Sequence, residues 1–113
     1  MAAKTLEKSK WEEYFNELSK KLKSEKAEVE VEAFGVFDHV EAEWLPIVGI
    51  SYDPKDDIFS VYMENEKGDN LDHIIHTPES VELDYDGDML KAVEIMGGDG
   101  GKTVIKFKVP LKA

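Results

Sequence analysis

The chain has 113 residues and a formal net charge of −11, and its 14 basic residues are all lysine. The absence of cysteine excludes disulfides, thiol nucleophiles and cysteine-ligated metals. The absence of arginine excludes the bidentate guanidinium grip on carboxylate or phosphate. No apolar run is long enough to span a bilayer, and the N-terminus lacks the apolar middle of a signal peptide, so we expect a cytoplasmic protein.

The length fits one domain, which we expect to cover residues 1–113. Charge is unevenly distributed within it. Residues 27–101 hold twenty acids against three lysines, whereas residues 102–113 hold four lysines and no acid. Because an acidic centre repels phosphate backbones and anionic lipid, neither nucleic acid nor a membrane is an expected partner.

A helix is predicted over about residues 10–23. Its apolar residues recur at spacings of four, three and four, which forms one stripe on a helix: Trp11, Phe15, Leu18 and Leu22. Ser9 followed by Glu12 matches a capping box at the helix start.

The apolar period then changes from 3.6 to two, which predicts a β-rich region over about residues 27–110. The inward positions of the first, second and last predicted strands are Val29, Val31, Ala33; Val40, Ala42, Trp44; and Ile105, Phe107, Val109. The segments "DPKDD", "DGD" and "GGDGG" are typical of turns between strands. The expected fold is therefore α+β, an N-terminal amphipathic helix packed on an antiparallel sheet of about six or seven strands.

Charge also predicts part of the strand order. The outer positions of the first strand are Glu28, Glu30 and Glu32, and those of the last strand include Lys106 and Lys108. Opposite charges on neighbouring strands stabilise a sheet, whereas like charges destabilise it. We therefore expect residues 28–32 to pair with residues 104–108.

The segment "DHIIH" is the best candidate for metal binding. In a helix, the spacing of three would place His73 and His76 on one face, where Asp72 could join them as a ligand. The alternative is a short helical turn whose Ile74 and Ile75 enter the core. The aspartates of "DPKDD" and "DYDGD" are interpreted as turn residues, because the second lacks the glycine and glutamate positions of an EF-hand.

The run "WLPIVGI" lacks alternation, so both faces of its strand need cover. Either the chain itself or a second molecule supplies that cover. If it is a second molecule, the expected contact residues are Trp44, Leu45, Pro46, Ile47 and Tyr52, flanked by Glu41 and Glu43. No nucleophile or phosphate-loop pattern accompanies this surface, so no catalytic residue and no cofactor is predicted, and a non-enzymatic role is favoured.

The segments "LEKSKWEEYF", "EAEWLPIVGISYDPKDD", "LDHIIHTP" and "VIKFKVPL" together resemble a family of small bacterial proteins known only as a domain of unknown function. The resemblance implies a stand-alone bacterial cytoplasmic domain and no particular activity. Three hypotheses follow from the residues. The first is an acidic interaction module that binds a protein partner or a second copy of itself. The alternative is a metal- or small-ligand-binding protein that uses His73, His76 and nearby aspartates. The third is that the acidic surface imitates nucleic acid and occupies a basic protein, which strong salt dependence of binding would favour.

Overall fold

The computed structural model describes residues 2–34, 39–65, 67–98 and 100–112, with only the backbone described for residues 2, 34 and 39–43. It contains one α-helix, one short 3-10 helix and eight strands within these ranges. In chain order they are β1 (Ala2–Leu6), η1 (Lys8–Lys10), α1 (Trp11–Ser24), β2 (Glu28–Phe34), β3 (His39–Asp53), β4 (Ile58–Glu64), β5 (Asn70–His76), β6 (Pro78–Asp86), β7 (Met89–Gly97) and β8 (Lys102–Lys112).

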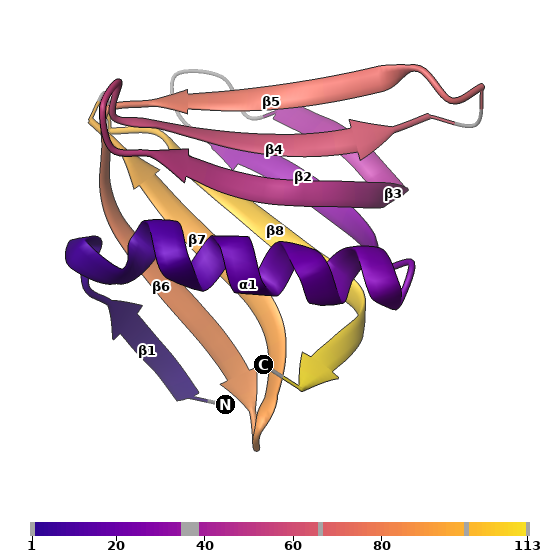
Figure 1. Ribbon diagram of the computed structural model, residues 1–113, viewed down its shortest axis with the longest axis horizontal. Helices are drawn as coiled ribbons and strands as arrows, with labels where there is room; N and C mark the ends of the chain where they lie inside the picture. Colours follow the sequence, from indigo (N-terminus) through magenta and orange to yellow (C-terminus); the bar gives the residue numbers. More distant parts are fainter. Residues whose placement is uncertain (1, 35–38, 66, 99, 113) are drawn as a thin grey trace.

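The eight strands form one antiparallel sheet in the order β1-β6-β7-β8-β2-β3-β4-β5. The long strand β3 joins its two parts, because its first half pairs with β2 and its second half pairs with β4. In Figure 1, α1 lies in front of the strands β6, β7 and β8, and β3, β4 and β5 lie above it in the view. The predicted α+β class is confirmed, but the strand count is higher than expected because β1 and β5 were not recognised as strands.

Helix α1 begins and ends within one residue of the predicted bounds, and its four predicted apolar residues are buried. The core centres on Phe59, whose ring centroid lies 5.3 Å from that of Trp11, 5.1 Å from that of Phe15 and 4.9 Å from that of Tyr52. These aromatic contacts hold the helix against β3 and β4. The predicted capping box is wrong: η1 leads directly into the helix, and no side chain caps its N-terminus.

The predicted pairing of the first and last strands of the β-rich region is confirmed. Strands β2 and β8 run antiparallel, with Glu30 opposite Lys106. Lys106 Nζ lies 3.0 Å from Glu32 Oε1 and 3.9 Å from Glu30 Oε1, and Lys108 Nζ lies 3.5 Å from Glu28 Oε2. The outer side of this part of the sheet is thus lined by paired charges.

Two inward assignments are wrong because the strands contain bulges. Trp44 is 39% exposed. Between the pairs Val31–Ala42 and Val29–Leu45, β3 contains one residue more than β2. Trp44 lies in this bulge with a φ of 46°. Val109 is 70% exposed, because the ladder between β7 and β8 also shifts register along this stretch. Val40 and Ala42 were also predicted to point inward, but their side chains lie outside the described part of the chain.

Among the described residues, no strand pairs with the second half of β3 on the side opposite β4, and helix α1 covers this edge. The Ser19 hydroxyl donates to the carbonyl of Ile50 at 2.8 Å and accepts from the Ile50 N–H at 2.9 Å. A Cβ atom on the neighbouring Gly49 would lie 3.1 Å from Ser19 Oγ. A glycine at position 49 therefore leaves room for the helix to satisfy the backbone of β3.

Candidate functional site

The aspartates of "DPKDD" form a turn, as predicted. Strands β3 and β4 pair up to Asp53 and Ile58, and the Asp53 carboxylate accepts hydrogen bonds from the backbone N–H groups of Lys55 (2.9 Å) and Asp56 (3.4 Å). The third aspartate, Asp57, accepts a 2.6 Å hydrogen bond from the Tyr52 hydroxyl. These carboxylates are thus occupied in local structure.

The Tyr52–Asp57 pair is also linked to the segment before the helix, because Lys8 Nζ lies 3.4 Å from Asp57 Oδ1. The Tyr52 hydrogen bond and, next, Lys8 lower the pKa of Asp57. Burial and the hydrogen bond to Asp57 raise the pKa of Tyr52 to about 12. Both shifts keep Tyr52 protonated and Asp57 ionised, which suits a structural contact rather than proton transfer at neutral pH.

The "DHIIH" segment is a strand, so the predicted helical turn is wrong. In a strand, residues three apart lie on opposite faces. Accordingly, Ile75 is buried and His73 is half-buried on the inner side, whereas Asp72 and His76 are exposed. His73 Nε2 lies 3.3 Å from Thr103 Oγ1 in β8. Among the described residues, no group of three or more metal-ligating side chains comes together. The geometry on which the metal hypothesis depended is therefore not formed.

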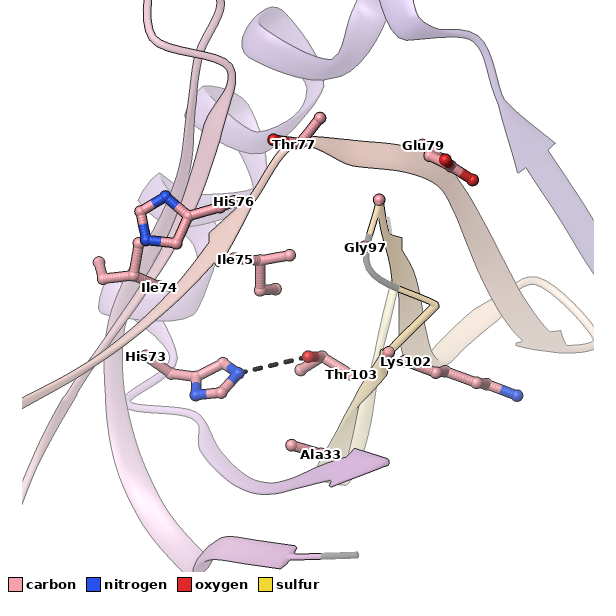
Figure 2. A pocket seen from close by; sticks show the side chains of 12 residues that line it. Ala33, His73, Ile74, Ile75, His76, Thr77, Glu79, Gly97, Lys102 and Thr103 are labelled. Carbon is pink, nitrogen blue, oxygen red and sulfur yellow. Dashed lines mark hydrogen bonds between the residues drawn. The ribbon is translucent and has the colours of Figure 1, made fainter. Parts of the chain in front are cut away.

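A hollow of about 510 Å³ lies between the C-terminal half of β5 and the hairpin of β7 and β8. Figure 2 shows Ile75 and His73 pointing toward the hairpin, while the His76 ring turns the other way. On the far side the lining consists largely of small residues, among them Gly98, Gly101 and Ala33. The lining also includes Thr77, Glu79, Lys102 and Thr103. Figure 2 shows the Glu79 and Lys102 side chains extending away from the hollow, whereas His73 and Thr103 face each other across it.

The structure separates the residues of the predicted partner surface. Ile47 and Tyr52 are buried in the core, so they are not available to a second molecule, and Leu45 is half-buried against the core. Only Trp44 and Pro46 are exposed. The side chains of the other two predicted residues, Glu41 and Glu43, lie outside the described part of the chain. The run "WLPIVGI" is thus covered largely by the chain itself.

Among the described residues, four other exposed apolar side chains lie on β3, β4 and β5. Leu71 lies opposite the buried Met63 and is therefore on the inner side. The other three we call the outer stripe: Val48 of β3 (40% exposed), Tyr62 of β4 (37%) and Ile74 of β5 (41%). Tyr62 lies opposite Gly49 on one side and Asp72 on the other, and Ile74 is paired two residues away, opposite Ser60. These registers place Tyr62 between the other two, diagonally across from Ile74 and beside the bulge of β3 that contains Val48.

The sequence contained a signal for part of this stripe. In "IFSVYMEN" the buried residues are Phe59, Val61 and Met63, so strict alternation places Tyr62 on the outer side. Ile74 was missed because β5 was interpreted as a helical turn. Val48 was missed because the bulge in β3 between Ile47 and Gly49 interrupts the alternation.

The loops at both ends of β4 are acidic. Residues 53–72, which contain β4 and the two loops that flank it, hold seven acidic residues against two lysines. By contrast, the glutamates on the outer side of β2 form ion pairs with the lysines of β8. The outer stripe therefore lies on strands whose connecting loops carry excess negative charge.

The structure and the site define a small α+β domain in which one helix packs on an eight-stranded antiparallel sheet. Within the ranges described, no helix combines the length and apolar character needed to cross a membrane. No solved structure matches the chain. The model of a family of unknown function, DUF5335, matches residues 2–113, and the chain belongs to this family. An uncharacterized protein of Aquifex aeolicus (strain VF5) is 33% identical over 113 residues, which covers 98% of each chain.

Proposed function

We propose that this protein is a non-enzymatic interaction module that binds a basic protein partner through the outer stripe. The observation that carries the proposal is the position of Val48, Tyr62 and Ile74, all more than a third exposed, on three neighbouring strands. Exposed apolar side chains scattered singly are common, whereas a contiguous group marks a contact surface. Tyrosine is also one of the residues that most often dominates a protein interface.

The charge around the outer stripe specifies the partner's chemistry. The acidic loops at both ends of β4 would attract a surface whose lysines and arginines surround an apolar centre. The net charge of −11 on the whole chain would accelerate the encounter with such a partner and would oppose binding to phosphate backbones. We place this activity in the bacterial cytoplasm, a location that the absence of cysteine supports.

The proposal can be tested by comparing two substitutions that introduce the same charge at exposed apolar positions. Val48→Asp alters the outer stripe, whereas Val109→Asp alters an exposed residue of β8 in a different part of the sheet. Both variants and the wild type would be used to capture proteins from cells of the native bacterium. A protein captured by the wild type would then be purified and titrated by isothermal calorimetry.

The expected partner is basic and binds the wild type and Val109→Asp equally. We expect its affinity to fall at least about tenfold for Val48→Asp and to weaken as the salt concentration rises. Circular dichroism and thermal melting establish that both variants are folded. Equal affinity for the two variants, or an affinity that does not change with salt, would contradict the proposal. Capture of only a second copy of this chain would contradict it as well.

A further inference from the structure

Strand β5 is an unpaired edge of the sheet, since β4 is its only neighbouring strand in the described part of the chain. In Figure 1 it is the uppermost of the labelled strands. It is seven residues long, and its pairing with β4 contains no register shift. A straight edge of this kind presents a row of backbone N–H and C=O groups that can pair with another strand.

The hydrogen bonds at the two ends of the ladder show which backbone groups face the open side. At one end the Asn65 N–H donates to the carbonyl of Asp69 at 2.9 Å, and at the other end the Thr77 N–H donates to the carbonyl of Asp57 at 3.0 Å. Both are odd-numbered pairs in one continuous register. In an antiparallel ladder hydrogen-bonded and non-hydrogen-bonded pairs alternate, so the odd residues of β5 bond to β4.

The even residues of β5 therefore direct their N–H and C=O groups away from β4: Asn70, Asp72, Ile74 and His76. The side chains of all four are exposed.

The edge lacks most features that normally prevent strands from pairing. Natural edge strands are protected by lysine, proline, a bulge or short length. Strand β5 contains no proline and none of the 14 lysines of the chain. Its one residue with a fixed charge is Asp72. The strand at the opposite edge, β1, is only five residues long and carries Lys4. The unprotected edge is thus confined to one side of the sheet.

We propose that β5 pairs in antiparallel fashion with β5 of a second copy of this chain, around a twofold axis that passes beside His73. With the two strands fully overlapped, Asn70 lies opposite His76 of the second copy and Asp72 lies opposite Ile74. Both partners in each of these pairs are even-numbered, so the groups that face the open edge meet one another. The full overlap forms about eight hydrogen bonds between the copies.

This register suits a second copy, because the outward-facing N–H and C=O groups of one β5 meet those of the other along the whole strand. The twofold axis places both outer faces on the same side of a continuous sheet, where Ile74 of each copy lies diagonally across the junction. The two outer stripes then form one longer apolar surface. Asp72 is the one residue of the paired segment with a fixed negative charge. The segment that pairs is therefore much less acidic than the chain as a whole, whose net charge is −11. The dimer does not depend on the basic partner proposed above.

The test uses a substitution that removes one outward-facing N–H group. Ile74→Pro eliminates a donor that takes no part in the ladder with β4, and proline is tolerated at such edge positions. Ile74→Val keeps the donor and serves as the matched control. Sedimentation velocity would be measured from about ten micromolar to about one millimolar protein. We expect the wild type and Ile74→Val to change from the 12.8 kDa monomer to twice that mass, and Ile74→Pro to associate at least about tenfold more weakly.

A second measurement does not require any variant. Amide hydrogen exchange of the wild type should slow at Asp72 and Ile74 as the protein concentration rises, because these N–H groups are bonded only between copies. A wild type that remains monomeric over the whole range would overturn the proposal. A dimer that Ile74→Pro leaves intact, or one without added protection at these two amides, would overturn it as well. Neither result bears on the partner captured through Val48.

Discussion

The contact between Ser19 and Ile50 allows a quantitative test of how helix α1 is held against the sheet. In Ser19→Ala, the N–H and C=O groups of Ile50 lose hydrogen bonds of 2.9 and 2.8 Å. At about 1 kcal/mol for each bond, the loss is about 2 kcal/mol. Alanine recovers about 0.5 kcal/mol through its higher helix propensity. The free energy of unfolding should therefore fall by about 1.5 kcal/mol.

Gly49 supplies the second half of this test. Its φ angle is not in the left-handed region, so alanine fits the backbone, but the new Cβ would lie 3.1 Å from Ser19 Oγ. Because two hydrogen bonds fix that oxygen, Gly49→Ala should cost about 1 kcal/mol in the wild type. In the Ser19→Ala background the oxygen is absent, and the same change should be neutral or stabilise by about 0.5 kcal/mol. The two substitutions should thus be coupled by at least about 1 kcal/mol.

Urea unfolding of the four proteins would measure these energies, with the midpoint changing and the denaturant slope constant. Ser24→Ala, at the exposed last residue of α1, is the control and should change stability by less than about 0.5 kcal/mol. If Ser19→Ala behaves like Ser24→Ala, or if Gly49→Ala costs the same in both backgrounds, the hydroxyl does not hold the edge of β3.

Two further predictions concern the aromatic core and the turn that follows β3. Phe59→Ala removes the ring at the centre of the core cluster, and its free energy of unfolding should fall by about 3–5 kcal/mol in urea titrations; a loss below about 2 kcal/mol would contradict the central position of this ring. Asp57→Asn removes a carboxylate whose pKa is lowered in the folded state, so the wild type should be the more stable protein above the ordinary aspartate pKa of about 3.9, and its advantage should disappear as the pH falls through the folded-state pKa. Chemical unfolding at several pH values would measure that difference, and an advantage that persists in acid would argue against the hydrogen bond from Tyr52 and the ion pair with Lys8 as its sources.

The local elements were determined by the sequence wherever one face of an element is buried. The spacing of Trp11 and Phe15 specified the helix to within one residue, and the alternation around Val29 and Val31 specified β2. The opposite charges of Glu30 and Lys106 were sufficient to predict that β2 and β8 are neighbours. Each of these features depends on residues close in the sequence or on charges that must be paired, so no knowledge of the complete sheet was needed.

The candidate surface was decided only by the tertiary structure. Whether Ile47 and Tyr52 face the core or a partner depends on where α1 crosses β3, and the bulge that exposes Trp44 depends on the pairing with β2. The "DHIIH" segment is compatible with a helical turn or a strand, and pairing with β4 selected the strand. That choice separated His73 from His76 and placed Ile74 at an open edge. Periodicity shows that a segment has two faces, but the neighbouring strands determine which face is buried and which edge remains unpaired.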